Sequence, residues 1–184
     1  MEPLELVQHL ARFQIGTTYN QYAESPLRRD RLARYLEQRR QAPVVLVGEA
    51  AGYRGARVSG IPFTSERQLT GSGPAEATAT IVHRVLAALG VEEDVLLWNV
   101  VPTHPGTDAS NRRPTRAEIE AAAPFLLEIN RGRRAIAVGR IAAAVLEAPY
   151  VRHPSRGGAA AFEEGLGRVL ATIGRRRAPV RPFS

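Results

Sequence analysis

Short runs of apolar residues alternate with amphipathic stretches along most of this 184-residue chain. Four of the runs predict β-strands, at residues 44–47, 94–99, 134–138 and 150–152. The first run, Val-Val-Leu-Val, is apolar on both faces and rich in β-branched residues, which is typical of a central strand covered on both sides. Amphipathic stretches at about 75–89, 115–130, 139–146 and 159–173 predict helices between and after the strands.

Local signals indicate where two of these helices begin and end. A Ser-Gly-Pro sequence at 72–74 precedes the first, with serine or glycine as the cap and proline in the first turn, and Gly90 ends it. Thr115 and Glu118 form a capping box, which predicts the start of the second helix.

Strand and helix alternate four times, which predicts a parallel sheet with right-handed crossovers and helices on both faces. Residues 1–40 are expected to be helical with a break at 17–26, and residues 175–184 to form a basic tail. We therefore expect a single domain over residues 1–184, an α/β fold built as a three-layer α/β/α sandwich around four parallel strands. No internal repeat or linker interrupts the sequence.

A glycine-rich turn follows the first predicted strand. Four glycines within residues 48–60 allow the main chain to turn tightly and approach a ligand closely. Glu49 lies at the carboxyl end of this strand, where open α/β sheets bind their ligands. Neither GxGxxG nor GxxxxGK[ST] is present, and the chain has no lysine, which argues against a P-loop nucleotide site. Taken alone, Glu49 in a glycine-rich loop is more often a solvated turn residue, and only the other motifs favour a functional role.

Asn99 and His153 are expected at the same carboxyl edge of the predicted sheet, because they stand at the ends of the second and fourth strands. Phe63 lies in the loop after the glycine turn, as a loop anchor or a stacking platform. A carboxylate stabilises a cation or positions water, an amide reads hydrogen-bonding edges, and an imidazole donates to an oxyanion. With an aromatic ring, this set suits cleavage of an N-glycosidic bond, although Asn99 alone is also consistent with a loop cap.

Composition narrows the classes of function. The chain has no cysteine, which excludes disulfides, thiolate zinc sites and cysteine-ligated iron–sulfur clusters within this sequence. No apolar stretch is long enough to cross a membrane and no signal peptide is evident, so we expect a cytoplasmic protein without a membrane partner. No two histidines have metal-ligand spacing, and we expect neither a metal nor another cofactor. The expected oligomeric state is a monomer.

The net charge is +7, and all 25 basic residues are arginines. A basic surface suits a polyanionic partner, whereas arginine in place of lysine is also what a GC-rich coding bias produces. Among the histidines, His104 is expected in a loop, with a pocket-lining role as the alternative. His9 and His83 are expected to pack or to lie at the surface, and Tyr53 either covers the pocket or only packs.

Six short motifs together resemble the uracil-DNA glycosylase superfamily, and its family 4 in particular. They are GEAAG at 48–52, GIPF at 60–63, WNVV at 98–101, NRRPT at 111–115, EI at 118–119 and HPS at 153–155. Their order and spacing match over about residues 44–166, which is far more specific than any one motif.

The resemblance implies a role for each matching residue. Glu49 would activate water or stabilise the sugar cation, Phe63 would stack on the extruded base, Asn99 would read its hydrogen-bonding edge, and His153 would stabilise charge on its O2. The base pocket would also include Gly48, Ala50 and Tyr53. Contacts with DNA would come from Ser155, Arg156, Gly157, Arg112 and Arg113.

The chain departs from the family 4 pattern in ways that bear on function. It lacks the four cysteines of the family 4 iron–sulfur cluster, so packing must stabilise its N-terminal region. Ala51 replaces the proline of GEAPG, and Gly52 stands where family 1 enzymes place a tyrosine that excludes the thymine methyl group. We therefore expect a permissive pocket, with uracil or another deaminated base as substrate.

The expected function is a monofunctional DNA glycosylase of base excision repair, which acts on DNA containing uracil or a related deaminated base. Bifunctional glycosylases commonly use an amine to form a Schiff base, and here only the N-terminal amine is present. The alternatives are a catalytically weak or inactive nucleic-acid-binding protein of the same fold and a hydrolase of free nucleosides or nucleotides.

Overall fold

The structure is a computed structural model that describes residues 1–175. Its centre is a four-stranded sheet in the order β2-β1-β3-β4. The strands are β1 (Val44–Ala50), β2 (Val95–Val101), β3 (Arg134–Val138) and β4 (Tyr150–Val151), and every pairing is parallel. The predicted four-stranded parallel sheet is confirmed.

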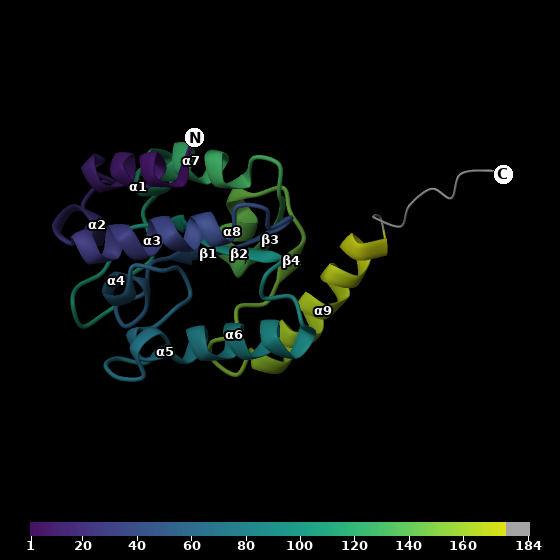
Figure 1. Cartoon of the computed structure of the whole chain (residues 1–184). Coiled ribbons are helices and arrows are strands. Elements are labelled where there is room, and N and C mark those ends of the chain that lie inside the picture. Colours follow the sequence, from purple (N-terminus) through teal and green to yellow (C-terminus); the bar gives the residue numbers. More distant parts are fainter. Residues whose placement is uncertain (176–184) are drawn as a thin grey trace.

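Helices cover both faces of the sheet (Figure 1). One layer consists of α1 (Pro3–Arg12), α2 (Gln21–Glu24), α3 (Pro26–Gln38), α7 (Arg116–Asn130) and α8 (Arg140–Val145). The opposite layer consists of α6 (Ala77–Leu89) and α9 (Ala159–Arg175). Two short helices, α4 (Ala56–Ser59) and α5 (Glu66–Thr70), lie in the connection after β1 and were not predicted.

Successive side chains of each strand point to opposite faces of the sheet, and this divides the hydrophobic core into two parts. Val45 and Val47 of β1 join Trp98 of β2 in the cluster under α1, α3 and α7, and Trp98 is fully buried. Val44 and Leu46 face the other way, into the cluster with α6 and α9. Both faces of β1 are thus apolar, as the sequence predicted, because successive side chains of a strand point to opposite sides.

Strands β1 and β2 extend beyond their predicted ends. Gly48, Glu49 and Ala50 belong to β1, and Asn99 lies inside β2 rather than at its end. Gly48 pairs with Asn99 in the sheet register. Glycine does not end β1 because neighbouring strands satisfy its backbone, and the turn after β1 therefore begins three residues later than expected.

Helix boundaries follow the expected signals in most places. Helix α7 begins behind Thr115, whose capping box with Glu118 is formed, and Gly90 caps α6 with φ of 65°. The start of α6 was predicted wrongly: its N-cap is Glu76, because the Ser-Gly-Pro sequence at 72–74 lies in the preceding loop.

The expected tail at 175–184 lies outside the described residues apart from Arg175. Within residues 1–175, no helix combines the length and apolarity that a membrane span needs.

The N-terminal segment is fixed by packing and by hydrogen bonds to the loop after β2. Leu6, Val7 and Leu10 of α1 are buried. Tyr19 and His104 exchange two backbone hydrogen bonds of 2.8 and 3.0 Å. These contacts hold a region for which the sequence predicted stabilisation by packing.

Candidate active site

A cleft of about 620 Å³ opens at the carboxyl edge of the sheet, where β1, β2 and the loop after β4 contribute side chains. Its walls bring together residues that are far apart in the sequence. They include Glu49, Ala50, Phe63, Asn99, Arg112, Arg113, His153, Ser155 and Arg156. Nine of the predicted site residues therefore share one cleft.

Glu49 is half buried at the end of β1, in the wall of the cleft. Burial raises the pKa of its carboxyl group, and the positive charge of Arg113 opposes this rise. A carboxylate with a raised pKa is suited to take up a proton from water near neutral pH.

Phe63 and Asn99 form one end of the cleft around Gly48. A Cβ atom at Gly48 would lie 2.8 Å from Asn99 Oδ1 and would collide with the Phe63 ring. Only glycine therefore allows the ring and the amide to lie side by side. Asn99 is 3% exposed, and its amide makes no hydrogen bond with any residue in 1–175, which leaves its donors and acceptor for a ligand.

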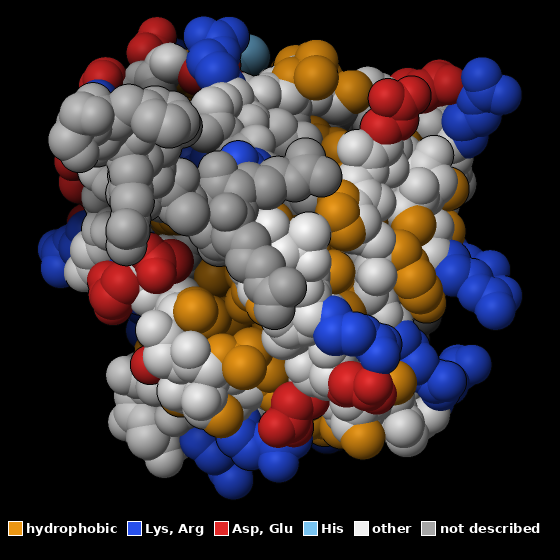
Figure 2. All heavy atoms as spheres, turned by 90° about the vertical axis from the view of Figure 1, so that its right-hand side faces the viewer, with side chains coloured by type: hydrophobic (Ala, Val, Ile, Leu, Met, Phe, Trp, Pro, Cys, Tyr) orange, Lys and Arg blue, Asp and Glu red, His pale blue; other side chains and the backbone are white. Residues whose placement is uncertain are grey.

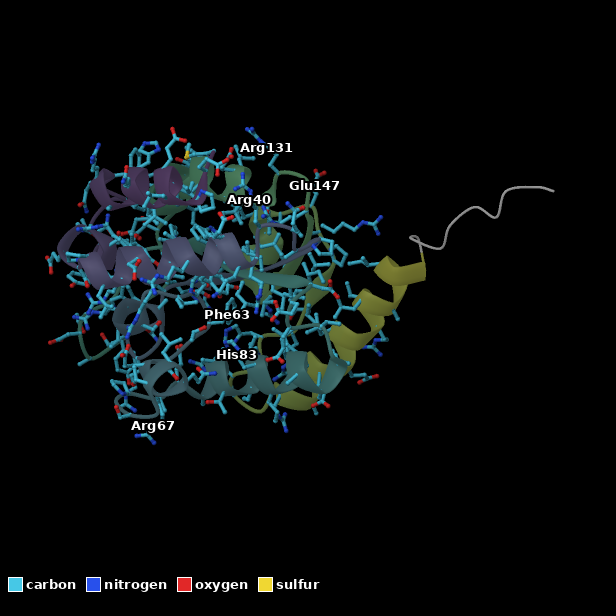
Figure 3. The ribbon with its side chains drawn as sticks, viewed as in Figure 1. Arg40, Phe63, Arg67, His83, Arg131 and Glu147 are labelled. Carbon is cyan, nitrogen blue, oxygen red and sulfur yellow. The ribbon has the colours of Figure 1, made fainter. Side chains whose placement is uncertain are left out.

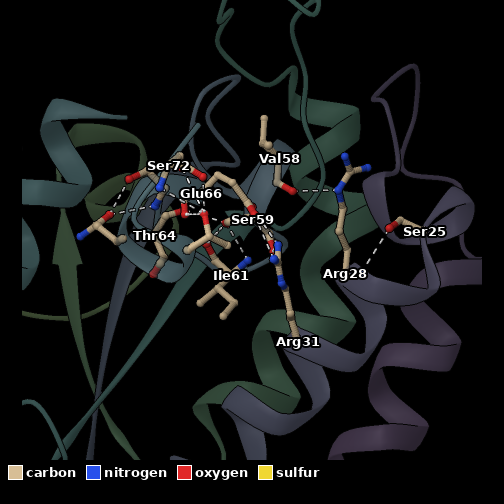
Figure 4. A network of polar contacts seen from close by, with 12 residues as sticks. Ser25, Arg28, Arg31, Val58, Ser59, Ile61, Thr64, Glu66 and Ser72 are labelled. Atoms are coloured by element: carbon tan, nitrogen blue, oxygen red, sulfur yellow. Dashed lines mark hydrogen bonds and ion pairs between the residues drawn. The ribbon is translucent and has the colours of Figure 1, made fainter. Parts of the chain in front are cut away.

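Phe63 has φ of 52°, a left-handed conformation that a bulky residue adopts only when its surroundings impose it. The surrounding loop supplies that constraint (Figure 4). Ser59 Oγ donates to the carbonyl of Thr64 at 2.6 Å, and Arg28 Nε donates to the carbonyl of Val58 at 2.9 Å. Arg31 of α3 holds the far end of the loop through a two-point ion pair with Glu66, at 2.8 and 2.9 Å.

His83 of α6 contacts the same loop. Its Nε2 lies 3.1 Å from Thr64 Oγ1, and burial lowers the pKa of the ring. Figure 3 shows His83 and Phe63 between the sheet and α6. His83 is thus a neutral packing residue, as the sequence suggested.

His153 is held in one tautomer by the loop after β4. The backbone N–H of Ser155 donates to His153 Nδ1 at 3.2 Å, and Ser155 Oγ lies 2.8 Å from the same atom. Because Nδ1 accepts, the neutral ring carries its hydrogen on Nε2. Burial lowers the pKa of His153, which favours this neutral form. The ring then offers a donor in a cleft that also holds Glu49.

His104 does not line the cleft but contacts the turn after β1, which lies beside it. The ring is fully buried, with Nδ1 2.7 Å from the carbonyl of Ala51 and Nε2 2.7 Å from the carbonyl of Thr107. Carbonyl oxygens only accept, so the ring donates to whichever carbonyl faces the nitrogen that carries hydrogen. Nearby, the Asn111 amide oxygen accepts from the backbone N–H of Tyr53 at 2.9 Å. The loop after β2 therefore positions the turn after β1.

Arginines provide the positive charge of the cleft, namely Arg112, Arg113, Arg140 and Arg156. Arg112 binds buried Glu118 through two contacts of 2.6 and 2.8 Å, which hold the pKa of Glu118 down at about 2. On the face shown in Figure 2, by contrast, basic and acidic side chains are interspersed with apolar ones. The walls of the cleft thus carry the positive charge that suits a polyanion.

Three predicted site residues lie outside the walls of this cleft: Gly48, Tyr53 and Gly157. Gly48 still shapes the cleft by leaving room for Phe63. The guanidinium of Arg54 instead lies over the Tyr53 ring, 5.3 Å from its centre, and the Tyr53 backbone N–H donates to Asn111. The predicted contact of Tyr53 with a base therefore has no support in the structure.

Sequence reasoning missed four polar residues in the walls: Glu76, Thr78, Asn111 and Arg140. Asn111 begins the NRRPT motif and Arg140 follows the carboxyl end of β3, so both positions carried a signal. Glu76 and Thr78 carried none, because the start of α6 was misplaced. No group of three or more potential metal ligands occurs within residues 1–175.

Comparison with known proteins gives consistent results. The sequence model of the uracil DNA glycosylase superfamily matches residues 36–175. A type-4 uracil-DNA glycosylase of Pyrobaculum aerophilum is 36% identical over 107 residues, which are 56% of this chain and 47% of that protein. The chain therefore matches about half the length of this curated relative. The crystal structure of wild-type SMUG2 of Pedobacter heparinus superposes with a TM-score of 0.68 at 13% identity, covering 97% of this chain and all of the other.

Proposed function

Because the chain belongs to the uracil-DNA glycosylase superfamily, we propose that it is a monofunctional DNA glycosylase that hydrolyses the N-glycosidic bond of uracil, or a related deaminated base, in DNA. The observation that carries this proposal is the meeting of Glu49, Phe63, Asn99 and His153 in one cleft. Each of these groups has a separate task in the reaction.

The extruded base stacks on Phe63, whose loop is held by the hydrogen bonds of Ser59 and Arg28. The unpartnered amide of Asn99 pairs with N3–H and O4 of the base. Arg113, Arg140 and Arg156 contact the phosphates of the strand, and these contacts offset the few kcal/mol that unstacking a base costs.

Hydrolysis then proceeds by attack of water on C1′ of the sugar. The C1′–N1 bond breaks and its electron pair moves onto the base, which gains negative charge on O2. His153 Nε2–H donates to this oxygen, and Glu49 takes a proton from the water as its oxygen bonds to C1′. Glu49 also stabilises the positive charge that develops on the sugar.

The reaction ends with an abasic site and an intact strand. No lysine is available for a Schiff base, and the N-terminal amine is bound to Glu128 at 2.6 Å, on the helical layer rather than in the cleft. A panel of oligonucleotides with uracil, a thymine mismatch, hypoxanthine or xanthine, scored for abasic sites before and after alkali, tests the proposal. Uracil release without strand cleavage supports it.

Binding of DNA with steep salt dependence and without base release would instead favour a binding protein of this fold. Activity on free nucleosides with little dependence on DNA would favour a small-molecule hydrolase.

A further inference from the structure

Phe63 is the third residue of a tight turn over residues 61–64. The backbone N–H of Thr64 closes this turn on the carbonyl of Ile61 at 3.2 Å. The φ of Phe63 is 52°, and a positive φ at this position of a turn favours glycine over a bulky residue. Such a conformation persists only when the surrounding structure imposes it. The ring of Phe63 therefore keeps its place only while the residues on both sides of the turn are fixed.

Side chains of the N-terminal helices α2 and α3 fix the chain before the turn. Three successive carbonyls at the end of α4 accept hydrogen bonds from them, at distances of 2.9 to 3.3 Å. The pairs are Arg28 with Val58, Arg31 with Ser59 and Tyr22 with Gly60. Gly60 has φ of 83°, and a Cβ atom there would lie 2.8 Å from the Cβ of Arg28. The backbone just before the turn thus packs directly against α3.

Tyr22 reaches Gly60 from a position that the core holds firmly. The ring is fully buried, in the cluster that also contains Leu10 and Leu32. Asn20 Oδ1 accepts from the backbone N–H of Tyr22 at 3.0 Å, which fixes the start of α2. The phenol donates to the carbonyl of Gly60 at 3.0 Å, and burial raises its pKa, so it keeps its hydrogen. A rigid donor therefore holds the residue that directly precedes the turn.

Arg31 connects both sides of the turn to a single helix (Figure 4). Before the turn, its Nη1 donates to the carbonyl of Ser59 at 3.3 Å. After the turn, its two terminal nitrogens bind the two carboxylate oxygens of Glu66 at 2.8 and 2.9 Å. A two-point pair of this kind fixes orientation as well as distance. Neither Tyr22 nor Arg31 lines the cleft, and the reaction described above gives them no task.

In the proposed function, on which this inference rests, the ring of Phe63 lies against the extruded base while the C1′–N1 bond breaks. We propose that Tyr22 and Arg31 are positioning residues for this reaction, which hold Phe63 in the conformation that stacks on the base. They act through the loop and from outside the cleft. Their loss should therefore slow base release after the DNA has bound and leave DNA binding nearly unchanged.

The first test compares Tyr22→Phe, which removes one hydroxyl and keeps the ring, with Tyr35→Phe as the matched control. The hydroxyl of Tyr35 on α3 also bonds the backbone, but it accepts from the N–H of Leu97 in β2, at 2.6 Å. Both variants should unfold at lower urea concentration than the wild type. Single-turnover release of uracil at saturating enzyme should fall about tenfold in Tyr22→Phe and less than about twofold in Tyr35→Phe. The enzyme concentration that gives the half-maximal rate should hardly change in either.

A double-mutant cycle with Phe63→Leu separates positioning from a general loss of stability. Leucine has no flat ring, so it offers no stacking surface for Tyr22 to position. In the Phe63→Leu background, Tyr22→Phe should therefore change the release rate by less than about twofold. Arg31→Gln is the second variant and should show the same pattern. Its control is Arg34→Gln, because Arg34 lies on the exposed side of α3 and pairs with Asp30.

The possible failures are distinguishable. A folded Tyr22→Phe or Arg31→Gln protein that releases uracil at the wild-type rate overturns the role of the residue changed and leaves the proposed function standing. The same holds if the matched control is equally slow, or if the loss persists undiminished with Phe63→Leu. If Tyr22→Phe does not fold, Arg31→Gln decides. A wild type that binds the DNA and releases no uracil overturns the proposed function and this inference with it.

Discussion

Gly48 of β1 lies directly beside Asn99 of β2, and the ring of Phe63 fills the space into which a side chain at position 48 would project. One residue without a side chain thus brings a stacking surface and a base-reading amide together. This relationship explains why the candidate site needs glycine inside a central strand, where glycine otherwise weakens the sheet.

The first prediction follows from this contact. Gly48→Ala should displace the Phe63 ring and the Asn99 amide and lower single-turnover uracil release about 100-fold or more, because small displacements of positioned groups cost about that much. Circular dichroism and unfolding by urea report whether the fold survives. A folded Gly48→Ala protein with wild-type activity would show that Phe63 does not stack on the base.

The second prediction concerns the pH dependence of Glu49. Its carboxylate must be ionised to accept a proton, and burial raises its pKa while Arg113 opposes the rise. Activity should therefore fall as pH decreases through a value above the ordinary 4.5. Arg113→Gln removes the opposing charge, so the acid limb of the kcat/KM profile should move to higher pH.

An Arg84→Gln variant is the control for the Glu49 profile, because Arg84 lies on the surface of α6 and pairs with Glu163. Its profile should overlay that of the wild type. An acid limb that stays in place in Arg113→Gln would mean that Arg113 does not act on the catalytic carboxylate.

The third prediction concerns the ion pair between Arg112 and buried Glu118. The pKa of Glu118 falls from 4.5 to about 2 in the folded state, so its contribution to stability is present above pH 4.5 and is lost as pH falls toward 2. Glu118→Gln should lower the free energy of unfolding at pH 7 by roughly 2 kcal/mol, since partial exposure of Arg112 screens the pair.

Urea unfolding at several pH values measures this contribution. Between pH 5 and pH 2, the stability difference between wild type and Glu118→Gln should shrink. A difference that stays constant over that range would mean that Glu118 is not a low-pKa carboxylate.

The fourth prediction concerns His104, whose two ring nitrogens each lie 2.7 Å from a backbone carbonyl, one of Ala51 and one of Thr107. His104→Leu should leave the buried carbonyl that accepts from the ring without its donor and destabilise the protein by roughly 1–3 kcal/mol. His104→Gln retains one donor group and should lose less. Uracil release should fall in both variants, because Ala51 follows directly on the strand that carries Glu49. Unchanged stability in His104→Leu would contradict the role assigned to this ring.

Much of this fold could be predicted from the sequence because its signals are local. β3 was predicted with both ends correct, and α7 begins at its capping box, since an apolar run or a cap is decided by neighbouring residues. Open α/β sheets bind their ligands at the carboxyl ends of their strands, and this rule also predicted that Glu49, Asn99 and His153 lie in one cleft.

The parts that were missed depend on contacts between distant segments. Gly48 remains in β1 because β2 pairs with it, which the glycine pattern alone does not reveal. Glu76 enters the cleft only because Gly52 and Gly55, over twenty positions earlier in the chain, leave it room. The buried position of His104 likewise depends on two carbonyls from separate loops.

Single-turnover release of uracil from a duplex oligonucleotide, compared among wild type, Glu49→Gln and His153→Ala, tests the central claim most directly. The account predicts that the wild type leaves an abasic site in an uncut strand and that each substitution slows release about 100-fold or more, while DNA binding changes little. Wild-type release that both substitutions leave unchanged, or no release by a wild type that binds the DNA, would contradict it.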